Sequence, residues 1–233
     1  DEVARISPME IICNDQVKLR ACLQREMQNA SEQPSAWFQL ANATEALCRH
    51  FALNDLSPLG LSDEYKAGAS AAGALMRYLS ETQKNALEHM TSLRIYQGSE
   101  TMLLDRNTRR NLELTESIRG RSRKGSLLWL LDKTSTAMGG RLLRSWIEQP
   151  LVDEEKINRR LDAVGEFAQE HVLTMTLAEE LQGVYDIERL LSKVAYKSMN
   201  ARDCLSLCAS LQKVPKIREL LREAKSQAVE EIR

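Results

Sequence analysis

The sequence predicts a mainly α-helical protein, a helical bundle preceded by a small partial α/β segment. Glycine and proline are scarce, at 10 and 5 of 233 residues, which favours long uninterrupted helices over turn-rich β structure. Apolar residues recur at spacings of three and four, which places them on one face of a helix. Hydrophobic residues make up 43% of the chain, enough for a folded core.

The α/β segment is expected in the first sixty residues. Residues 8–13 (PMEIIC) predict a short strand that ends at a turn-prone Asn-Asp pair. Helical patterns follow at about 16–28 and 36–51. A single strand leaves its backbone N–H and C=O groups without partners. We therefore expect residues 1–60 to be loosely ordered, or the strand to pair with a second copy of itself.

The best domain boundary is the loop at residues 54–60, where proline and glycine interrupt the helical pattern. Ser62 is then expected to cap a helix that opens with many alanines and glycines. Interior glycines destabilise a helix by about 1 kcal/mol each, so close approach of another backbone is expected to compensate. The apolar stripe through Leu75 and Leu79 predicts the side of this helix that faces the core.

The middle of the chain combines short apolar runs with a basic loop. Residues 102–105 are expected to form a strand or a buried turn that leads into a helix at 106–114. The loop at 120–125 (GRSRKG) is expected to be flexible, because it has two glycines and no apolar residue. Ser126 is expected to cap an apolar helix at 127–131.

Further helices are expected through the last third of the chain. Their apolar stripes lie at about 142–147, 157–168, 187–195, 200–209 and 217–224. Asp153 is expected to cap the second of these helices, and Asn200 with Asp203 to begin the fourth. Pro215 is expected in the first turn of the last helix, where its missing N–H is tolerated. We expect the stripes to pack against one another as the core.

Composition excludes several classes of protein. The net charge is −1, so any nucleic-acid contact must be local or belong to parts outside this chain. No apolar run approaches the roughly 20 residues of a membrane span, and no signal peptide opens the chain. The odd number of cysteines, without disulfide-like spacing, fits a reducing compartment. Cys204 and Cys208 are interpreted as core residues rather than metal ligands.

No catalytic, cofactor-binding or metal site is expected in this chain. The one phosphate-loop candidate, residues 120–126, lacks a lysine between its second glycine and the serine that follows. The three histidines are far apart and share no metal-ligand spacing. Trp37, Trp129 and Trp146 lie in apolar stretches and are expected in the core.

Two basic clusters remain. The first is expected to form an ion-pair network of three arginines with three nearby acids, namely Arg106, Arg109, Arg110, Asp105, Glu113 and Glu116. The second has four cations and no adjacent acid: Arg119, Arg121, Arg123 and Lys124. This second cluster is a candidate contact surface for a phosphate or an acidic partner, and a solvated loop is the alternative.

Seven segments of the sequence, in order, resemble one protein family. They are AAGALMRYL (71–79), LDRNTRRNLEL (104–114), GSLLWLLDKT (125–134), AMGGRLLRSW (137–146), QPL (149–151), NRRLD (158–162) and DIERLL (186–191). Together they resemble the MutS family of bacterial mismatch-recognition ATPases. The matching blocks span about residues 65–215, and residues 1–60 resemble the family more weakly.

The resemblance implies a place within a longer protein, and both ends of the chain look cut. Residues 1–60 would be the C-terminal part of the α/β connector domain. Residues 61–233 would be the first segment of the helical core or lever domain, ending before the clamp. The family's Phe-X-Glu mismatch motif and its phosphate loop have no counterpart here. The resemblance therefore implies a part that is not an enzyme and holds no cofactor of its own. ATP, magnesium, mismatched double-stranded DNA and a second MutS-type subunit would be bound through the parent, in the bacterial cytoplasm.

The expected function is structural. Stiff packed helices can transmit a displacement between distant sites as a rigid body. We therefore expect a non-catalytic connector–lever part that couples mismatched-DNA binding to the ATPase domain in mismatch repair, although a family member acting in recombination fits this region too. The Gly139-Gly140 pair is expected to allow a tight helix crossing. The alternative is a stand-alone helical adaptor that binds a protein partner.

Overall fold

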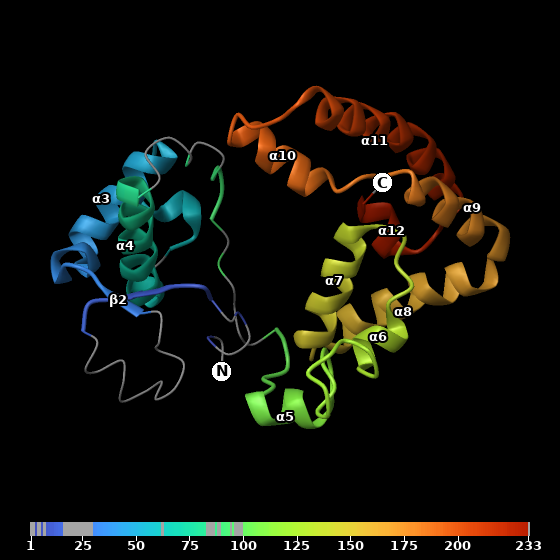
Figure 1. Ribbon diagram of the computed structural model, residues 1–233, viewed down its shortest axis with the longest axis horizontal. Coiled ribbons are helices and arrows are strands. Elements are labelled where there is room, and N and C mark those ends of the chain that lie inside the picture. Colours follow the sequence, from blue (N-terminus) through green and yellow to red (C-terminus); the bar gives the residue numbers. More distant parts are fainter. Residues whose placement is uncertain are drawn as a thin grey trace. The chain divides into compact units, whose positions relative to one another are not determined.

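A computed structural model describes residues 3, 6, 8–15, 30–61, 63–82, 87, 90–93, 95 and 100–232. The chain divides into two compact units, Asp1–Tyr96 and Gln97–Arg233, which are described separately below. Figure 1 shows their elements, coloured from blue at the N-terminus to red at the C-terminus. The helix expected at 16–28 and the cap expected at Ser62 lie outside the described residues.

The first unit contains a small parallel sheet. Strand β1 (Ile11–Cys13) pairs with strand β2 (Ala30–Glu32), and Ile11 lies opposite Ala30. The strand predicted near the N-terminus is therefore confirmed, whereas the expectation that it has no partner within the chain is wrong. Strand β2 escapes prediction because its sequence, Ala-Ser-Glu, has no β-branched or aromatic residue.

Two helices form the core of the first unit. The 3₁₀ turn η1 (Ser35–Phe38) leads into α3 (Leu40–Phe51), which packs against α4 (Lys66–Thr82). The buried residues are mostly small: Ala43 and Leu47 on α3, and Ala69, Gly73, Ala74 and Met76 on α4. Leu75 was predicted to face the core but is 44% exposed, because the face with the small residues is the one that meets α3.

Gly73 marks the closest approach of α3 and α4. A Cβ atom at this position would lie within 3.0 Å of the Ala43 backbone. The expectation that a neighbouring backbone compensates for a glycine inside this helix is confirmed at Gly73. Gly68, one turn earlier on the same helix, faces open space.

The loop at residues 54–60 does not separate the two compact units. It contains the 3₁₀ turn η2 (Ser57–Leu59), is followed by η3 (Asp63–Tyr65), and joins α3 to α4 within the first unit. Because these two helices pack together, the chain divides after Tyr96 rather than after residue 60. Helix α4 therefore belongs to the first unit and not to the helical part that follows.

The described part of the second unit is helical, apart from an isolated antiparallel bridge between Thr101 and Leu151. Its helices are α5 (Arg106–Asn111), α6 (Leu127–Leu131), α7 (Ala137–Glu148), α8 (Glu154–Gln169), α9 (His171–Gln182), α10 (Ile187–Ala195), α11 (Ala201–Leu220), the 3₁₀ turn η4 (Leu221–Glu223) and α12 (Gln227–Ile232). The prediction of a mainly helical chain with a small sheet near its N-terminus is confirmed.

Polar side chains begin most of these helices. The caps predicted for α6, α8 and α11 are Ser126, Asp153 and Asn200, and each accepts a hydrogen bond from the backbone N–H three residues later. The Asp203 carboxylate accepts a hydrogen bond from the Asn200 backbone N–H, which completes a capping box. Helices α5, α7 and α10 are capped in the same way by Asp105, Thr136 and Asp186.

Helix α11 is a single helix of 20 residues with Pro215 inside it. The expectation that Pro215 begins a separate helix is therefore wrong. Proline lacks an N–H and crowds the carbonyl group four residues earlier, which belongs here to Leu211. Leu211 is 54% exposed, so this part of α11 lies at the surface of the second unit.

The second unit buries few large side chains. Its buried apolar residues, among those described, are Leu104, Leu114, Leu128, Leu173, Leu190, Ala224 and Val229. The stripe predicted on α8 is largely open, with Leu161 at 57% and Val164 at 62% exposure. The expectation that every apolar stripe packs into a core within this chain is therefore wrong.

Several residues expected in the core lie at the surface. Trp129 and Trp146 are 48% and 39% exposed, and Cys204 and Cys208 are exposed as well. The guanidinium of Arg160 lies 3.7 Å from the centre of the Trp146 ring, a cation–π contact that places a charge over this ring. None of the helices described by the structure is both long enough and apolar enough to cross a membrane.

Candidate functional site

The predicted basic loop is a hairpin closed by its own hydrogen bonds. We call residues 117–125 the basic hairpin. The Ser117 N–H donates to the Ser122 carbonyl at 2.9 Å, and the Arg121 N–H donates to the Ser117 carbonyl at 3.0 Å. Arg121 and Gly125 adopt positive φ angles of 45° and 92°, which reverse the chain direction. The segment thus forms a hydrogen-bonded turn.

Both ends of the basic hairpin are fixed to neighbouring structure. At the start, the Glu113 carboxylate accepts the Ile118 N–H at 2.6 Å. At the end, the Ser126 hydroxyl donates to the Arg123 carbonyl at 2.7 Å and accepts the Trp129 N–H at 3.2 Å. Ser126 is only 2% exposed. One buried hydroxyl therefore joins the hairpin to the first turn of α6.

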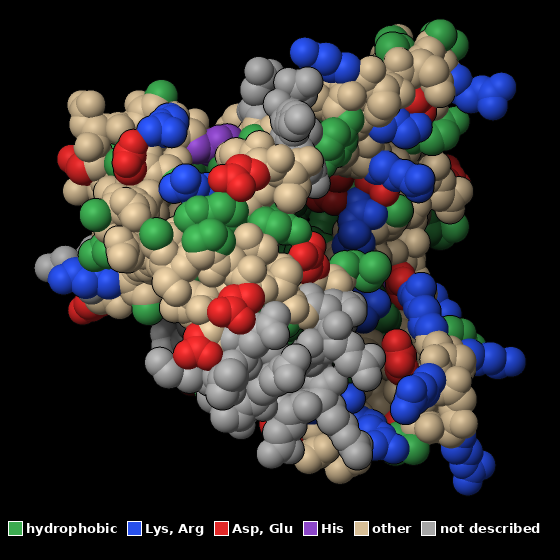
Figure 2. Space-filling model, turned by 60° about the vertical axis from the view of Figure 1, so that its left-hand side comes forward, with side chains coloured by type: hydrophobic (Ala, Val, Ile, Leu, Met, Phe, Trp, Pro, Cys, Tyr) green, Lys and Arg blue, Asp and Glu red, His purple; other side chains and the backbone are tan. Residues whose placement is uncertain are grey.

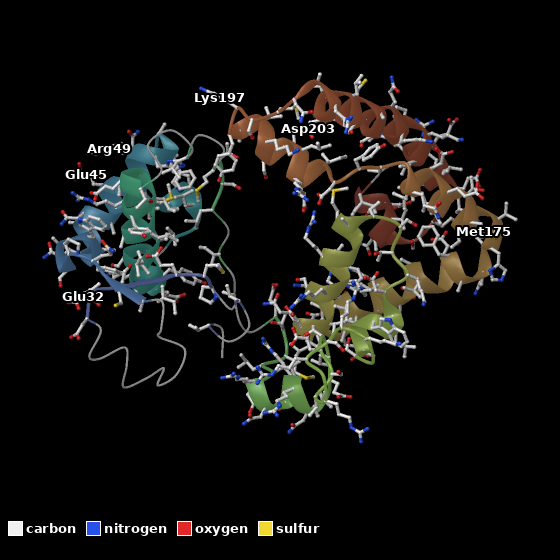
Figure 3. The ribbon with its side chains drawn as sticks, in the orientation of Figure 1. Glu32, Glu45, Arg49, Met175, Lys197 and Asp203 are labelled. Carbon is white, nitrogen blue, oxygen red and sulfur yellow. The ribbon has the colours of Figure 1, made fainter. Side chains whose placement is uncertain are left out.

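The four predicted cations of this hairpin divide into two kinds. Arg123 forms an ion pair with Asp132, whereas Arg119, Arg121 and Lys124 are exposed and form no ion pair with any residue that the structure describes. Figure 3 shows nitrogen-tipped side chains projecting outward from α5 and the segment after it. Figure 2 shows Lys and Arg side chains standing out at the lower right of its view. The unpaired positive charge of the basic hairpin, among the described residues, thus consists of these three cations.

Asp132 organises the turn on the other side of α6. Hydrogen bonds from the Thr134 side chain and backbone, at 2.6 and 3.1 Å, and then from Arg123, lower the pKa of Asp132. This turn lies against the first turn of α7: a Cβ at Gly140 would lie 3.3 Å from the Thr134 hydroxyl. Gly139 and Gly140 therefore make room for a turn, and the expectation that they allow a helix crossing is wrong.

The ion-pair network predicted around α5 does not form among the described residues. Asp105 caps α5 instead, accepting the Thr108 N–H at 2.6 Å, and these hydrogen bonds lower the pKa of Asp105. Glu113 accepts the Ile118 N–H at the start of the basic hairpin. The Nε of Arg109 is buried without a hydrogen-bond partner. Asp105 and Glu113 thus accept hydrogen bonds from backbone N–H groups, whereas the sequence predicted that they pair with arginines.

A set of ion pairs connects separate helices of the second unit. In the first, Arg141 on α7 binds Asp186 through its two terminal guanidinium nitrogens, at 2.7 and 2.8 Å, and Glu188 at 2.6 Å. Asp186 also caps α10. Donation from Arg141 lowers the pKa of Asp186, and acceptance of these hydrogen bonds by Asp186 and Glu188 raises the pKa of Arg141.

Two further sites, with three ion pairs between them, attach α11. Lys193 on α10 lies 2.7 Å from Asp203, whose pKa is lowered by this bond and by the Asn200 N–H. Glu180 on α9 accepts from Lys213, at 2.8 Å, and from Lys216, and both bonds lower the pKa of Glu180. We call these three sites, centred on Asp186, Asp203 and Glu180, the charged helix junctions. Figure 3 labels Asp203 beside α10 and α11.

The junctions escaped prediction because their partners lie far apart in sequence. Arg141 and Asp186 are separated by 45 residues and Glu180 and Lys213 by 33. Local signals marked only the helix starts at Asp186, which precedes an apolar stripe, and at Asn200 with Asp203; they did not identify the lysine and arginine partners. Within the described residues no group of three or more His, Cys, Asp or Glu side chains could hold a metal ion. The arrangement joins helices of the second unit.

Comparison with known proteins gives two family matches that follow one another along the chain. Residues 1–91 match the model described as MutS domain II, and residues 107–233 match MutS domain III. Helix α4 lies within the domain II match, as it lies within the first compact unit.

Individual relatives agree with these matches. The chain is 39% identical over 237 residues to the DNA mismatch repair protein MutS of Lachnoclostridium phytofermentans, covering 100% of this chain and 25% of that protein. It is 43% identical to the proteins of the same name from Ruminiclostridium cellulolyticum, over 226 residues, and Halothermothrix orenii, over 225 residues. Those matches cover 95% and 96% of this chain and 25% of each relative. The chain thus spans about a quarter of the length of these relatives.

Proposed function

The chain belongs to the MutS family of DNA mismatch repair proteins, and from this premise we propose that it relays conformational change between the DNA-binding and ATPase ends of a longer protein. The first unit would serve as the connector and the second as the beginning of the helical core or lever. The relay itself would be non-catalytic. ATP with magnesium, mismatched DNA and a second subunit would be bound by domains outside residues 1–233.

The observation that carries this proposal is the set of charged helix junctions. Each junction joins two helices at or near a helix end, α7 to α10, α10 to α11, and α9 to α11. A displacement of α7 would therefore be passed along the series instead of being absorbed by a loop. Coupling between distant sites needs elements that move as units. This arrangement favours a relay over the stand-alone helical adaptor.

The test is the substitution Arg141→Gln in the full-length parent. This change removes the guanidinium that joins α7 to Asp186 and Glu188. We expect ATP hydrolysis without DNA and heteroduplex binding without nucleotide to stay near their normal values. We call the ratio of the ATPase rates with heteroduplex and with matched duplex the coupling factor. It should shrink about two-fold or more, within the range seen for residues that carry coupling.

The matched control is Arg49→Gln in the same parent. Arg49 pairs with Glu45 one turn away on α3, and both side chains are largely exposed, so the pair connects no separate elements. The control should leave the coupling factor unchanged. The relay proposal fails if the two variants have the same coupling factor, measured as the ratio of ATPase rates with heteroduplex and with matched duplex.

A further inference from the structure

We propose that the basic hairpin is a contact site for the sugar-phosphate backbone of duplex DNA, independent of base sequence and of mismatches. The site would use Arg119, Arg121 and Lys124. It goes beyond the relay described above and does not depend on it, because the hairpin takes no part in the charged helix junctions.

The first support is the amount of unpaired positive charge. Three of the four cations in residues 119–124 have no acidic partner among the described residues, and all three are exposed. The chain as a whole has a net charge of −1. Free positive charge is therefore concentrated on one turn of a nearly neutral chain, and a contact with phosphate groups needs such a local concentration.

The second support is the set of hydrogen bonds within the hairpin and at its two ends. The bonds between Ser117 and Ser122, and those of Ser126 to Arg123 and Trp129, fix the backbone between two anchored ends. A turn that is ordered beforehand loses less conformational entropy on binding than a flexible loop does. Arg123 forms an ion pair with Asp132, so we assign it to stabilising the hairpin and not to binding the ligand.

The third support is the chemistry of the tip. Residues 119–125 contain no apolar side chain, only cations, one serine and two glycines. Protein interfaces usually have an apolar centre in which aromatic residues are enriched. Contacts to the DNA backbone need only positive charge and hydrogen-bond donors. The tip therefore fits a phosphate backbone better than it fits an acidic polypeptide.

The test measures binding of the 233-residue chain to a short matched duplex, by fluorescence anisotropy, at several salt concentrations. Each phosphate neutralised contributes about −0.9 to the slope of log affinity against log salt. Three cations therefore predict a contribution of about −2.7, equivalent to an affinity about 40-fold lower at 0.2 M than at 0.05 M salt. The variant Arg119→Gln/Arg121→Gln/Lys124→Gln should lose this contribution, and Lys124→Gln alone should lose about a third of it.

The control removes the same charge elsewhere in the second unit, as Arg202→Gln/Arg218→Gln/Arg222→Gln. These arginines are exposed, on α11 and η4, and form no ion pair with a described residue. The control should keep the slope of the unaltered chain. The proposal is overturned if both triple variants lose the same slope, or if the chain does not bind duplex at the lowest salt. It is also overturned if an acidic peptide of equal charge binds the unaltered chain more tightly than the duplex does.

Discussion

Each of the two compact units of this chain is stabilised internally by a different kind of contact. In the first unit, α3 and α4 meet through alanine and glycine, and a single Cβ at Gly73 would collide with the opposite backbone. In the second unit, large apolar side chains such as Leu161 stay exposed, and charged side chains connect the helices. Close packing responds to volume, whereas ion pairs respond to pH and salt. The two units should therefore fail under different conditions.

Acidification should give the largest contrast. Of the described carboxyls whose pKa is lowered, one lies in the first unit, Asp55, and the second unit has Asp105, Asp132, Glu166, Glu180, Asp186 and Asp203. Such a group binds fewer protons folded than unfolded. Its stabilisation is complete above the unfolded pKa, about 4, and is lost as pH falls through the lower folded value. We expect the second unit to open first below about pH 4.

Hydrogen exchange followed by mass spectrometry would measure this contrast, with rates corrected for the intrinsic effect of pH. Peptides from α10 and α11 should lose protection as the pH falls below about 4, while peptides from α4 keep most of theirs. Equal loss in α4 and α10 would show that the junctions do not hold the second unit together.

The substitution Gly73→Ala addresses packing in the first unit. The added methyl group would lie within 3.0 Å of the Ala43 backbone, so the helices must move apart. We expect the free energy of unfolding to fall by about 1–3 kcal/mol. Gly68→Ala on the same helix meets no atom within 4 Å and should instead stabilise by about 0.5–1 kcal/mol. Urea denaturation of both variants would measure this, and a stabilised Gly73→Ala would contradict the close approach.

The substitution Ser126→Ala addresses the second unit, with a smaller expected effect. It removes a buried hydroxyl that caps α6 and bonds the Arg123 carbonyl. Loss of a serine cap typically lowers stability by about 1 kcal/mol. Ser122→Ala removes an exposed hydroxyl of the same hairpin and should change stability by less than about 0.5 kcal/mol. Thermal unfolding curves that coincide for the two variants would contradict the role of Ser126.

Prediction from sequence succeeded where the cause was local and failed where it was not. The caps Ser126, Asp153 and Asn200 were found because a cap and the N–H it binds are three residues apart. Burial was misjudged because periodicity identifies an apolar face but not whether anything covers it, as the exposed Leu161 shows. Strand β2 was missed because its partner, and not its own composition, makes it a strand.

The candidate site followed the same rule. Four cations of the basic hairpin were identified by the absence of adjacent acids, which is a local feature. That Arg123 is bound to Asp132 was not predicted, since α6 lies between them in the sequence. The junction at Arg141 depends on residues more than forty positions away. A sequence read without contacts could suggest charges in these places but could not pair them.

Pro215 has a consequence for the stiffness of α11. This helix is about 30 Å long at 1.5 Å per residue, and the missing N–H makes Pro215 the easiest place to bend it. Lys213 and Lys216, on either side of the proline, both hold Glu180 on α9. Bending there would stretch one of these ion pairs, so the attachment to α9 should resist bending of α11 at Pro215. Since ion pairs weaken as salt rises, the length over which α11 behaves as a straight rod should vary with ionic strength.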